Sequence, residues 1–313
     1  MSEPRSAVTG AFGFTGRAIA RLLVDSGVPV VTLARRVDTS DPLFHRLEHI
    51  APADFGRPTE LQRALQGVHT FYNTYWIRFP RGTENFDRAI AETAVLLGAA
   101  REAGVKRIVH FSVTNAGVSG ATPYFTAKAQ TEEMIRASGL PYAIVRPSLL
   151  FGSGDILLNN MAWALRRLPL FGVPGDGAYS VQPIHVDDVA RLAVEAGSRT
   201  GNEVFDAVGQ EMFSYRDLVL AVRAAVGSSA RIVSMPPAVV VLSAAFLGRL
   251  VGDVVLTRDE VTELMSGWLV SREPGRGETP LSSWLTANGS AIGRRYASEL
   301  SRNFAVHREL RRV

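Results

Sequence analysis

The sequence contains no cysteine and almost no lysine. Without cysteine, disulfides, thiolate metal sites and cysteine nucleophiles are excluded. Among the 34 basic residues only Lys106 and Lys128 are lysines, so arginine supplies nearly all of the positive charge. The N-terminal stretch MSEPRSAVTGAFG has no apolar segment behind a basic start, which is not typical of a secretory signal. We therefore expect a cytoplasmic protein.

Long apolar runs and dense blocks of charge are also scarce. The most apolar stretch covers residues 236–256, but Arg249 and Asp253 interrupt it before it reaches the ~18–20 residues that a membrane span requires. We expect a helix there that is buried, lines an apolar pocket or docks on a partner, and no membrane span. The net charge is only +4, and no stretch before the arginine-rich C-terminal tail is densely basic, so no nucleic-acid partner is expected.

Short apolar runs alternate with helical patterns from residue 6 to about 150. This rhythm is typical of an α/β fold with a parallel sheet covered by helices on both faces. The predicted strands cover 6–9, 28–35, 49–54, 70–75, 107–112 and 142–147, and the predicted helices cover 15–26, 59–66, 84–103 and 125–138. The rhythm then changes, so we expect a first domain over 1–150 and a smaller mixed region over 151–313 that is partly interwoven with it.

In this second region the pattern is less regular. It predicts helices over 154–171, 184–197 and 215–226, and strands over 203–207 and 231–234. His185 stands at the start of the second of these helices, where we expect it to cap or orient the helix. His45 and His49 are four residues apart, but their segment reads HRLEH and matches no metal-site pattern, so no metal is expected.

The stretch VTGAFGFTG, residues 8–16, follows a predicted strand and opens a predicted helix. Its glycines have the spacing of a dinucleotide-binding loop: Gly10 permits a tight turn, Gly13 lets the backbone approach a pyrophosphate, and Gly16 lets the helix pack close to the strand. The phosphates then lie at the positive end of the helix. The other loop residues that we expect at the cofactor are Phe12, Phe14 and Thr15. A glycine-rich turn without a ligand is the alternative.

The end of the second predicted strand distinguishes between the two pyridine dinucleotides. An acidic residue there would hold the ribose 2′-hydroxyl of NAD(H), whereas this chain has Arg35 and Arg36, which suit a 2′-phosphate. NADP(H) is therefore the preferred cofactor, and the nearby Asp38 leaves NAD(H) open. Asp54, after the third strand, is placed to contact the adenine amino group or to cap the next helix.

Further site residues are expected at the carboxyl ends of other strands, because ligands of open α/β sheets bind at that edge. Asn73 and Pro147 are predicted cofactor contacts. Tyr75 and Trp76 are predicted to line a substrate pocket, or alternatively to fill it. Thr114, after the fifth strand, is placed in the same pocket.

The segment YFTAK puts Tyr124 and Lys128 four residues apart on one face of a predicted helix. A tyrosine has a pKa near 10, and a neighbouring ammonium lowers it so that the phenol can work as an acid or base. Ser112, at the end of the preceding strand, is placed to orient a substrate carbonyl. The alternative is that Tyr124 only packs and Lys128 only binds the nucleotide.

These segments together resemble the short-chain dehydrogenase/reductase superfamily, more narrowly its extended and atypical branches, which include epimerase/dehydratase-like and NmrA-like proteins. The resemblance rests on TGAFGFTG, VKRIVHFSVTNA, YFTAKAQTEEMIRASGLPYAIVRPSLLFG and VQPIHVDDVA over residues 6 to about 190. It implies a Rossmann-type doubly wound sheet and a catalytic Ser112, Tyr124 and Lys128. The segments LTRDEVTEL and PLSSWL are similar to the tail of proteins related to the NADP(H)-binding accessory subunit of respiratory complex I.

Two functions follow as hypotheses. One is an NADP(H)-dependent oxidoreductase acting on a small carbonyl or hydroxyl compound, with Tyr124 as acid or base. The other is a non-catalytic NAD(P)H-binding sensor or accessory protein, which the bulky NTYW segment at the end of the fourth strand favours. Whether the protein forms a homodimer or binds a partner protein stays open.

Overall fold

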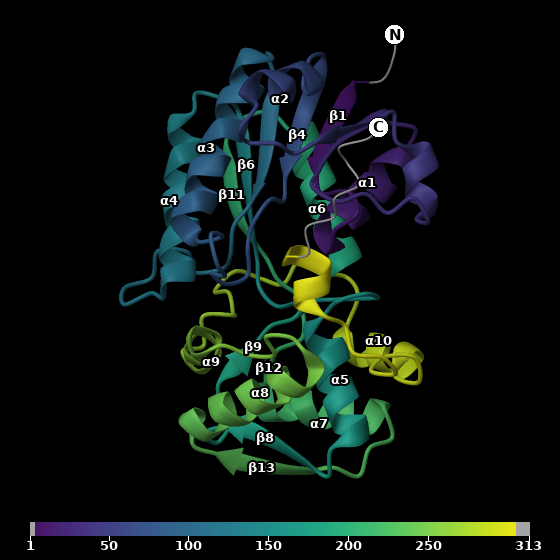
Figure 1. Ribbon diagram of the computed structural model, residues 1–313, viewed down its shortest axis with the longest axis vertical. Helices are drawn as coiled ribbons and strands as arrows, with labels where there is room; N and C mark the ends of the chain where they lie inside the picture. Colours follow the sequence, from purple (N-terminus) through teal and green to yellow (C-terminus); the bar gives the residue numbers. More distant parts are fainter. Residues whose placement is uncertain (1–3, 305–313) are drawn as a thin grey trace. The chain divides into compact units, whose positions relative to one another are not determined.

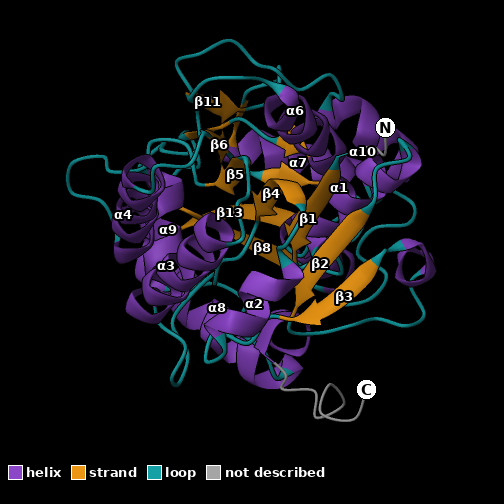
Figure 2. Ribbon diagram, turned by 90° about the horizontal axis from the view of Figure 1, so that it is seen from above, coloured by secondary structure: helices purple, strands orange, loops and turns teal. Residues whose placement is uncertain are grey.

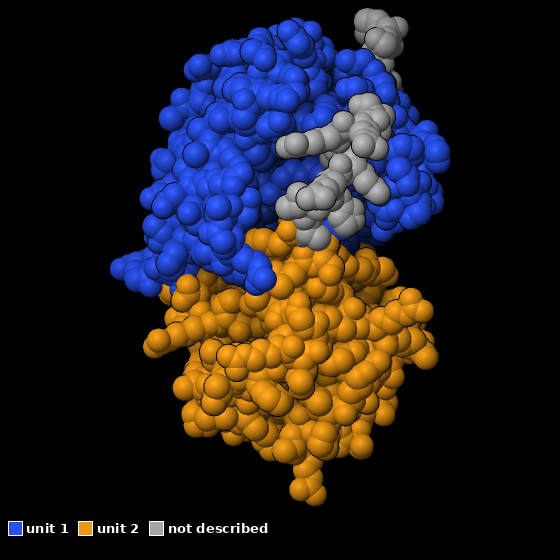
Figure 3. All heavy atoms as spheres, viewed as in Figure 1, with its two compact units in different colours: residues 1–147, 186–206, 307–313 blue, residues 148–185, 207–306 orange. Residues whose placement is uncertain are grey.

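The computed structural model of the protein describes residues 4–304 (Figure 1). Arg308, Arg311 and Arg312 of the C-terminal tail lie outside these residues. The chain divides into two compact units, drawn in different colours in Figure 3. Among the described residues, the first unit holds 4–147 together with 186–206, and the second unit holds 148–185 together with 207–304. The chain thus returns to its first unit before it completes the second.

A seven-stranded sheet forms the centre of the first unit, and its strand order is β11-β6-β5-β4-β1-β2-β3. The strands are β1 (Arg5–Thr9), β2 (Val30–Ala34), β3 (His49–Pro52), β4 (Val68–Asn73), β5 (Arg107–Phe111), β6 (Tyr142–Pro147) and β11 (Glu203–Ala207). The pairings among the first six strands are all parallel. Because β1 lies between β2 and β4, the order reverses direction there, and the predicted Rossmann-type doubly wound sheet is confirmed.

Helices cover both faces of this sheet, as Figure 2 shows from above. The helices α1 (Phe14–Asp25) and α6 (Val186–Ser198) pack together on one face, and α2 (Pro58–Ala64), α3 (Phe86–Glu102) and α4 (Pro123–Ala137) follow one another on the other. Each turns an apolar stripe toward the strands, and α1 buries Ile19 and Leu23 in this way. A short 3-10 helix, η1 (Pro42–Arg46), precedes β3.

A buried arginine ties the returning segment 186–206 to the sheet. Arg107 on β5 is 3% exposed, and it donates hydrogen bonds to the carbonyls of Ala196 (2.7 Å) and Gly201 (2.6 Å) and pairs with Glu203 (3.1 Å). An added Cβ at Gly197 would overlap the hydroxyl of Tyr72, so α6 reaches the sheet this closely only through a glycine. These contacts place α6 and β11 in the first unit.

The second unit has its own core around Phe151, Leu158, Val219 and Leu285. Its elements are β7 (Leu150–Phe151), α5 (Leu157–Arg167), β8 (Leu170–Pro174), β9 (Ser180–Val181), β10 (Ile184–His185), β12 (Phe213–Ser214), α7 (Tyr215–Ala225), β13 (Arg231–Met235), α8 (Pro237–Val251), α9 (Arg258–Met265), α10 (Leu281–Asn288) and the π-helical turn η2 (Leu300–Phe304). The strands form three small two-stranded sheets. The helix predicted over 184–197 begins two residues later, at Val186, because Ile184 and His185 pair with β7.

The prediction of one helix over 154–171 is wrong at its C-terminal end. α5 stops at Arg167, and residues 170–174 form β8 instead. Pro169 has no backbone N–H and disfavours a helical conformation at Leu168, which is extended with φ −101° and ψ 139°. The strand then pairs with β13, where Leu170 lies opposite Arg231.

For the helix expected over 236–256, the structure rules out burial on all sides, because α8 exposes one face; lining an apolar pocket or docking on a partner stays a prediction. Val240, Ala244 and Gly248 are buried, but Leu242, Phe246 and Leu250 are 71%, 62% and 69% exposed. Within residues 4–304 no helix is long and apolar enough to cross a membrane.

Candidate functional site

The glycine loop connects β1 to α1 by a tight turn. Gly10 has φ +66°, a left-handed conformation that glycine adopts without strain. Its N–H donates to the carbonyl of Leu33 on β2 (2.8 Å), and its own carbonyl accepts from Gly13 N–H (2.8 Å). Thr32 supports the turn from β2, since its hydroxyl accepts from Ala11 N–H (3.1 Å).

The first turn of α1 offers unpaired backbone donors. Its N-cap is Gly13, which has no side chain to accept a hydrogen bond, and no acidic residue lies in the first turn. The N–H groups of a first helical turn have no acceptor within the helix, so those of Phe14, Thr15 and Gly16 point toward the loop with the positive end of the helix dipole. This arrangement fits an anion such as a pyrophosphate.

The close packing behind this turn leaves no room for a side chain. A Cβ at Gly16 would overlap the carbonyl oxygen of Gly10 and would lie 2.7 Å from that of Thr9. A Cβ at Gly13 would lie 3.1 Å from the Gly10 carbonyl oxygen. The turn at Gly10–Gly16 is therefore built from backbone alone and has the geometry that fits the pyrophosphate of a dinucleotide.

Arg35 follows β2 at the same edge of the sheet and is 38% exposed. Its guanidinium lies 5.4 Å from the centre of the Tyr75 ring, and its Nη1 is 3.6 Å from Glu84 Oε2. Arg36 is half-buried. Asp38 accepts hydrogen bonds from the hydroxyl and N–H of Ser40, which hold the pKa of its carboxyl below its usual value. The carboxylate of Asp38 is thus engaged in a local turn.

Asp54 is half-exposed after β3, and it also forms a local turn. Its Oδ1 accepts from Gly56 N–H (3.0 Å), and its Oδ2 lies 3.5 Å from Arg57 Nε. The capping alternative is wrong, because the next helix, α2, has Arg57 as its N-cap and no side-chain capping hydrogen bond. One oxygen still faces solvent and Arg57.

Asn73, at the end of β4, is fully buried and its side chain is occupied by internal hydrogen bonds. Oδ1 accepts from Tyr75 N–H (3.2 Å) and lies 3.3 Å from the Thr9 hydroxyl, while Nδ2 is 3.2 Å from His110 Nδ1. Burial keeps the pKa of His110 well below its usual value, and Lys128 adds to this effect. A neutral His110 accepts from Asn73 and donates to Thr131 (3.3 Å).

Tyr75 and Trp76 follow β4 and have different neighbours. Tyr75 packs on Phe55 with ring centres 4.9 Å apart, lies under Arg35, and donates a short hydrogen bond to Glu92 on α3. Burial and this carboxylate raise the pKa of the Tyr75 phenol far above its usual value. Tyr75 therefore stays neutral and lies beside Arg35 and Phe55.

Trp76 covers Lys128. The Lys128 ammonium lies 4.2 Å from the centre of the Trp76 ring and donates to the carbonyl of Phe111 (2.7 Å). Lys128 is 3% exposed, and burial lowers the pKa of its ammonium to about 7, although Glu132 opposes this. The lysine is therefore both enclosed and close to losing its proton at neutral pH.

Tyr124 is half-buried and belongs to the same aromatic cluster. Its ring meets Trp76 edge-on at 6.2 Å and Phe86 edge-on at 5.9 Å, and Trp76 stacks on Phe86 at 6.2 Å. The indole N–H of Trp76 is buried and has no hydrogen-bond partner among the described residues. Tyr124 and Lys128 thus meet on one aromatic surface, as their spacing on α4 predicts, but that surface is packed.

Ser112 and Thr114 are both buried after β5, where Asn115 turns the chain with φ +56°. The Ser112 hydroxyl faces Glu132, yet makes no hydrogen bond of ordinary geometry within the described residues. Thr114 N–H donates to the carbonyl of Pro147 (3.1 Å), which joins the ends of β5 and β6. Lys128 donates to the carbonyl of Phe111, the residue directly before Ser112. Ser112, Tyr124 and Lys128 therefore lie in one region.

The residues around Arg35 and Lys128 include several that the sequence did not single out. Glu84, Phe86, Glu92 and His110 all touch predicted site residues, and Arg88 pairs with Glu84 and Glu92. Most of them lie on the loop before α3 or on α3 itself, in the segment RGTENFDRAIAE. No motif marks them, since their role depends on which strand ends α3 packs beside.

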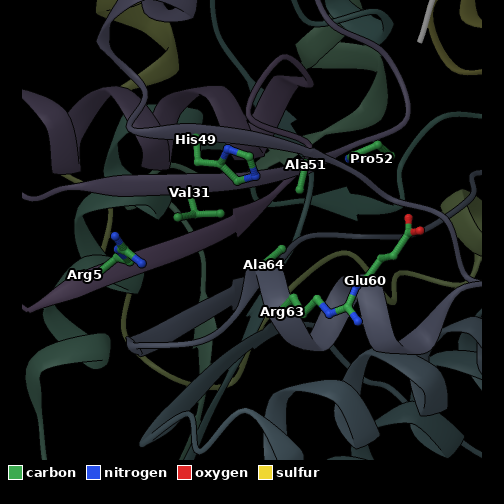
Figure 4. A pocket seen from close by; sticks show the side chains of 8 residues that line it. All are labelled: Arg5, Val31, His49, Ala51, Pro52, Glu60, Arg63 and Ala64. Carbon is green, nitrogen blue, oxygen red and sulfur yellow. The ribbon is translucent and has the colours of Figure 1, made fainter. Parts of the chain in front are cut away.

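A surface hollow of about 420 Å³ lies elsewhere on the first unit, between β2, β3 and α2 (Figure 4). Arg5, His49, Glu60 and Arg63 are among its lining side chains. No predicted cofactor or substrate residue lines it. Within the part of the chain that the structure describes, no cluster of three histidine, aspartate or glutamate side chains could hold a metal ion.

Comparison with known proteins agrees with this geometry. Residues 10–197, more than half of the chain, match a family model described as NAD(P)H-binding. The solved structure of the Citrobacter sp. triphenylmethane reductase, complexed with NADP(H), superimposes with a TM-score of 0.73 at 20% identity and covers 91% of this chain and 99% of that one. This likeness shows the fold.

Two relatives by sequence differ in kind. The ceramide reductase of Caulobacter vibrioides is 28% identical over 234 residues, which cover 74% of this chain and 73% of that protein. The mitochondrial NADH dehydrogenase (ubiquinone) 1 alpha subcomplex subunit 9 of Arabidopsis thaliana is 28% identical over 224 residues, 67% of this chain. The chain spans 55% of that subunit's length. The resemblance to both reductases and the accessory subunit of complex I is confirmed.

The tight packing at Gly16 generates a first prediction. Replacing Gly16→Ala forces the loop away from α1, so we expect affinity for NADPH and NADH to fall by roughly tenfold or more. Gly98→Ala is the control, because a Cβ at this α3 glycine meets nothing within 4 Å. Fluorescence titration of both variants measures the effect, and equal affinities in the two would contradict the cradle.

The buried Lys128 predicts a pH dependence of stability. The folded pKa is about 7 and the unfolded value is 10.5, so the unfolded chain binds more protons between these values and the free energy of unfolding rises with pH in that window. Lys128→Met removes this rise, which amounts to a few kcal/mol. Urea unfolding at pH 7 to 10 measures it. The chain's other lysine, Lys106, is exposed, so the free energy of unfolding of Lys106→Met should depend on pH as in the wild type. If Lys128→Met also shows the wild-type rise with pH, the prediction is refuted.

Proposed function

The chain belongs to the NAD(P)H-binding family, and from this premise we propose that it is an NADP(H)-dependent oxidoreductase of the short-chain dehydrogenase/reductase type. Its substrate is a small carbonyl or hydroxyl compound, and Tyr124 is the acid or base. The observation that carries the proposal is the pairing of the backbone cradle at Gly10–Gly16 with Tyr124 and Lys128 on a single aromatic surface.

The bound dinucleotide supplies a hydride to the substrate carbonyl carbon or takes one from the alcohol. Tyr124 donates the proton that the carbonyl oxygen needs, or accepts it in the reverse direction. Lys128 favours the phenolate of Tyr124 when it is charged, and its place against the Phe111 carbonyl holds it beside this helix face. Ser112, buried with its hydroxyl toward Glu132, is the donor proposed to orient the substrate oxygen.

The cofactor-binding residues proposed here are those of the loop and the adjoining strand ends. The backbone of Gly10, Gly13 and Gly16 holds the pyrophosphate, together with the N–H groups of Phe14 and Thr15. Phe12 covers the loop, and Asn73 and Pro147 shape the strand ends beside the nicotinamide. Arg35 and Arg36 bind the 2′-phosphate, which makes NADP(H) the preferred cofactor.

The substrate region proposed for this site is aromatic. Trp76, Phe86 and Tyr124 contact one another, and Thr114 lies buried behind β5. An apolar group next to the reacting carbonyl would pack on these rings. Tyr75 contributes through its support of Arg35, since its ring lies on that side.

The same cluster favours a second candidate function, a non-catalytic NAD(P)H-binding sensor or accessory protein. Trp76 lies on Lys128 and against Tyr124, in the space that a substrate would need. The similarity to an accessory subunit of NADH dehydrogenase is in keeping with such a role. In this case NADPH binds, but no carbonyl compound oxidises it.

Replacing Tyr124→Phe tests the first candidate. Turnover with a carbonyl panel should fall by roughly 100-fold or more, because the proton donor is lost, while the NADPH dissociation constant stays within about twofold. Tyr142→Phe is the control, because Tyr142 is the first residue of β6 and the proposed site lies at the other, carboxyl end of that strand. NADPH oxidation followed at 340 nm gives the rates.

The outcomes separate the two candidates. Unchanged turnover in Tyr124→Phe would remove this residue from the mechanism. If the wild-type protein binds NADPH tightly but turns over no compound of the panel, only the non-catalytic candidate remains. Absence of binding to either dinucleotide would overturn both.

The cofactor preference is tested at Arg35. Wild-type protein should bind NADPH more tightly than NADH, and Arg35→Met should weaken NADPH binding by about 10- to 100-fold while changing NADH binding little, because only NADPH carries the 2′-phosphate. Arg101→Met, which removes an exposed arginine in the last turn of α3, should leave both unchanged. Tighter binding of NADH by the wild type would contradict the role given to Arg35.

A further inference from the structure

We propose that Glu84 is a specificity-determining residue of the dinucleotide site. Its carboxylate shares Arg35 with the 2′-phosphate and thereby limits how strongly the site prefers NADP(H) to NAD(H). The inference rests on the proposed function, in which Arg35 binds that phosphate. The dinucleotide-binding fingerprint places an acidic residue at the end of β2. Glu84 comes instead from the loop after β4, far from that position in sequence.

The backbone on both sides of Glu84 is held in place. Glu84 N–H donates to the carbonyl of Arg81 (3.0 Å), and the carbonyl of Glu84 accepts from Arg81 N–H (2.7 Å). Directly after it, the side chain of Asn85 caps α3 by accepting from Arg88 N–H (2.8 Å). The carboxylate of Glu84 therefore starts from a fixed point beside Arg35.

Glu84 acts on Arg35 through charge and leaves the N–H donors of the Arg35 guanidinium available for a phosphate. The distance of 3.6 Å from Arg35 Nη1 to Glu84 Oε2 is too long for a good hydrogen bond but close for an ion pair. A guanidinium has five N–H donors, so most of them remain for a phosphate. The Tyr75 ring, 5.4 Å from Arg35, supports the guanidinium from another side.

The second nearby cation does not offset Glu84, because it has carboxylate partners of its own. Arg88 pairs with Glu92 (2.7 Å) and with Glu84 (3.2 Å), and Glu92 also binds the Tyr75 hydroxyl. Arg35 and Arg88 thus stand against Glu84 and Glu92, so this cluster itself adds little net positive charge, beside Arg36, for a phosphate dianion. Without the charge of Glu84 the cluster would be cationic.

The two cofactors respond differently to this charge. The 2′-phosphate of NADPH is repelled by the Glu84 carboxylate and competes with it for Arg35. The 2′-hydroxyl of NADH carries no charge and can donate to a carboxylate. Glu84 therefore weakens NADPH binding selectively, and Glu84→Gln should remove this effect with little change in shape.

The test is a fluorescence titration of wild-type protein and Glu84→Gln with NADPH and NADH at one ionic strength. We expect the ratio of the NADH to the NADPH dissociation constant to rise by about fivefold in Glu84→Gln, from tighter NADPH binding. Glu133→Gln is the matched control, because it removes the charge of a surface Glu–Arg pair on α4 and should leave the ratio unchanged. In an Arg35→Met background, Glu84→Gln should raise the ratio less than it does in the wild type, because the competition for Arg35 is gone and only the direct repulsion remains.

An unchanged ratio in Glu84→Gln would overturn the inference. A lower ratio would also overturn it, because it would mean that Glu84 holds Arg35 in place for the phosphate. An equal rise in Glu133→Gln would show a general effect of net charge and would also overturn it. If the wild type prefers NADPH and only the Glu84 effect is missing, the proposed function stands. If the wild type binds neither dinucleotide, both fail.

Discussion

The contact between the backbone of α1 and the turn at Gly10 is the constraint on which the rest of the site depends. No side chain fits between Gly16 and the Gly10 carbonyl, so the helix begins directly at the carboxyl end of β1. Its N-cap is a glycine, and its first N–H groups stay free for an anion. Since the neighbouring strands run parallel, their carboxyl ends reach the same edge, and every other proposed residue is placed relative to this cradle.

Two aromatic residues divide that edge into two chemically different regions. Tyr75 faces Arg35 and belongs to a network of charges that includes Glu84, Arg88 and Glu92. Trp76 faces Lys128 and belongs to a packed apolar cluster. In the proposed function, the first region affects which dinucleotide is bound, and the second affects whether a substrate reacts there. Two consecutive residues after β4, Tyr75 and Trp76, therefore contribute one to each region.

The elements of the first unit were largely predictable, and β6 and β11 have the predicted bounds of 142–147 and 203–207. Their buried strands read as apolar runs, and the helices follow with a clear periodicity. The second unit was predicted less well, because β8 depends on pairing with β13 about sixty residues away. For the site, the sequence supplied Gly16, Tyr124 and Lys128 by their spacing, but not Glu84 or Phe86.

Spacing along the chain determined the class of fold, the turn at Gly10–Gly16 and the shared face of Tyr124 and Lys128, because these depend on the local geometry of a turn and a helix. Only the tertiary structure decided that Trp76 encloses Lys128 and that Glu84 pairs with Arg35. Both are contacts between segments that are far apart in sequence, brought together by the packing of α3 and α4 beside the strand ends. Burial and charge pairing of this kind arise from packing, and no local pattern encodes them.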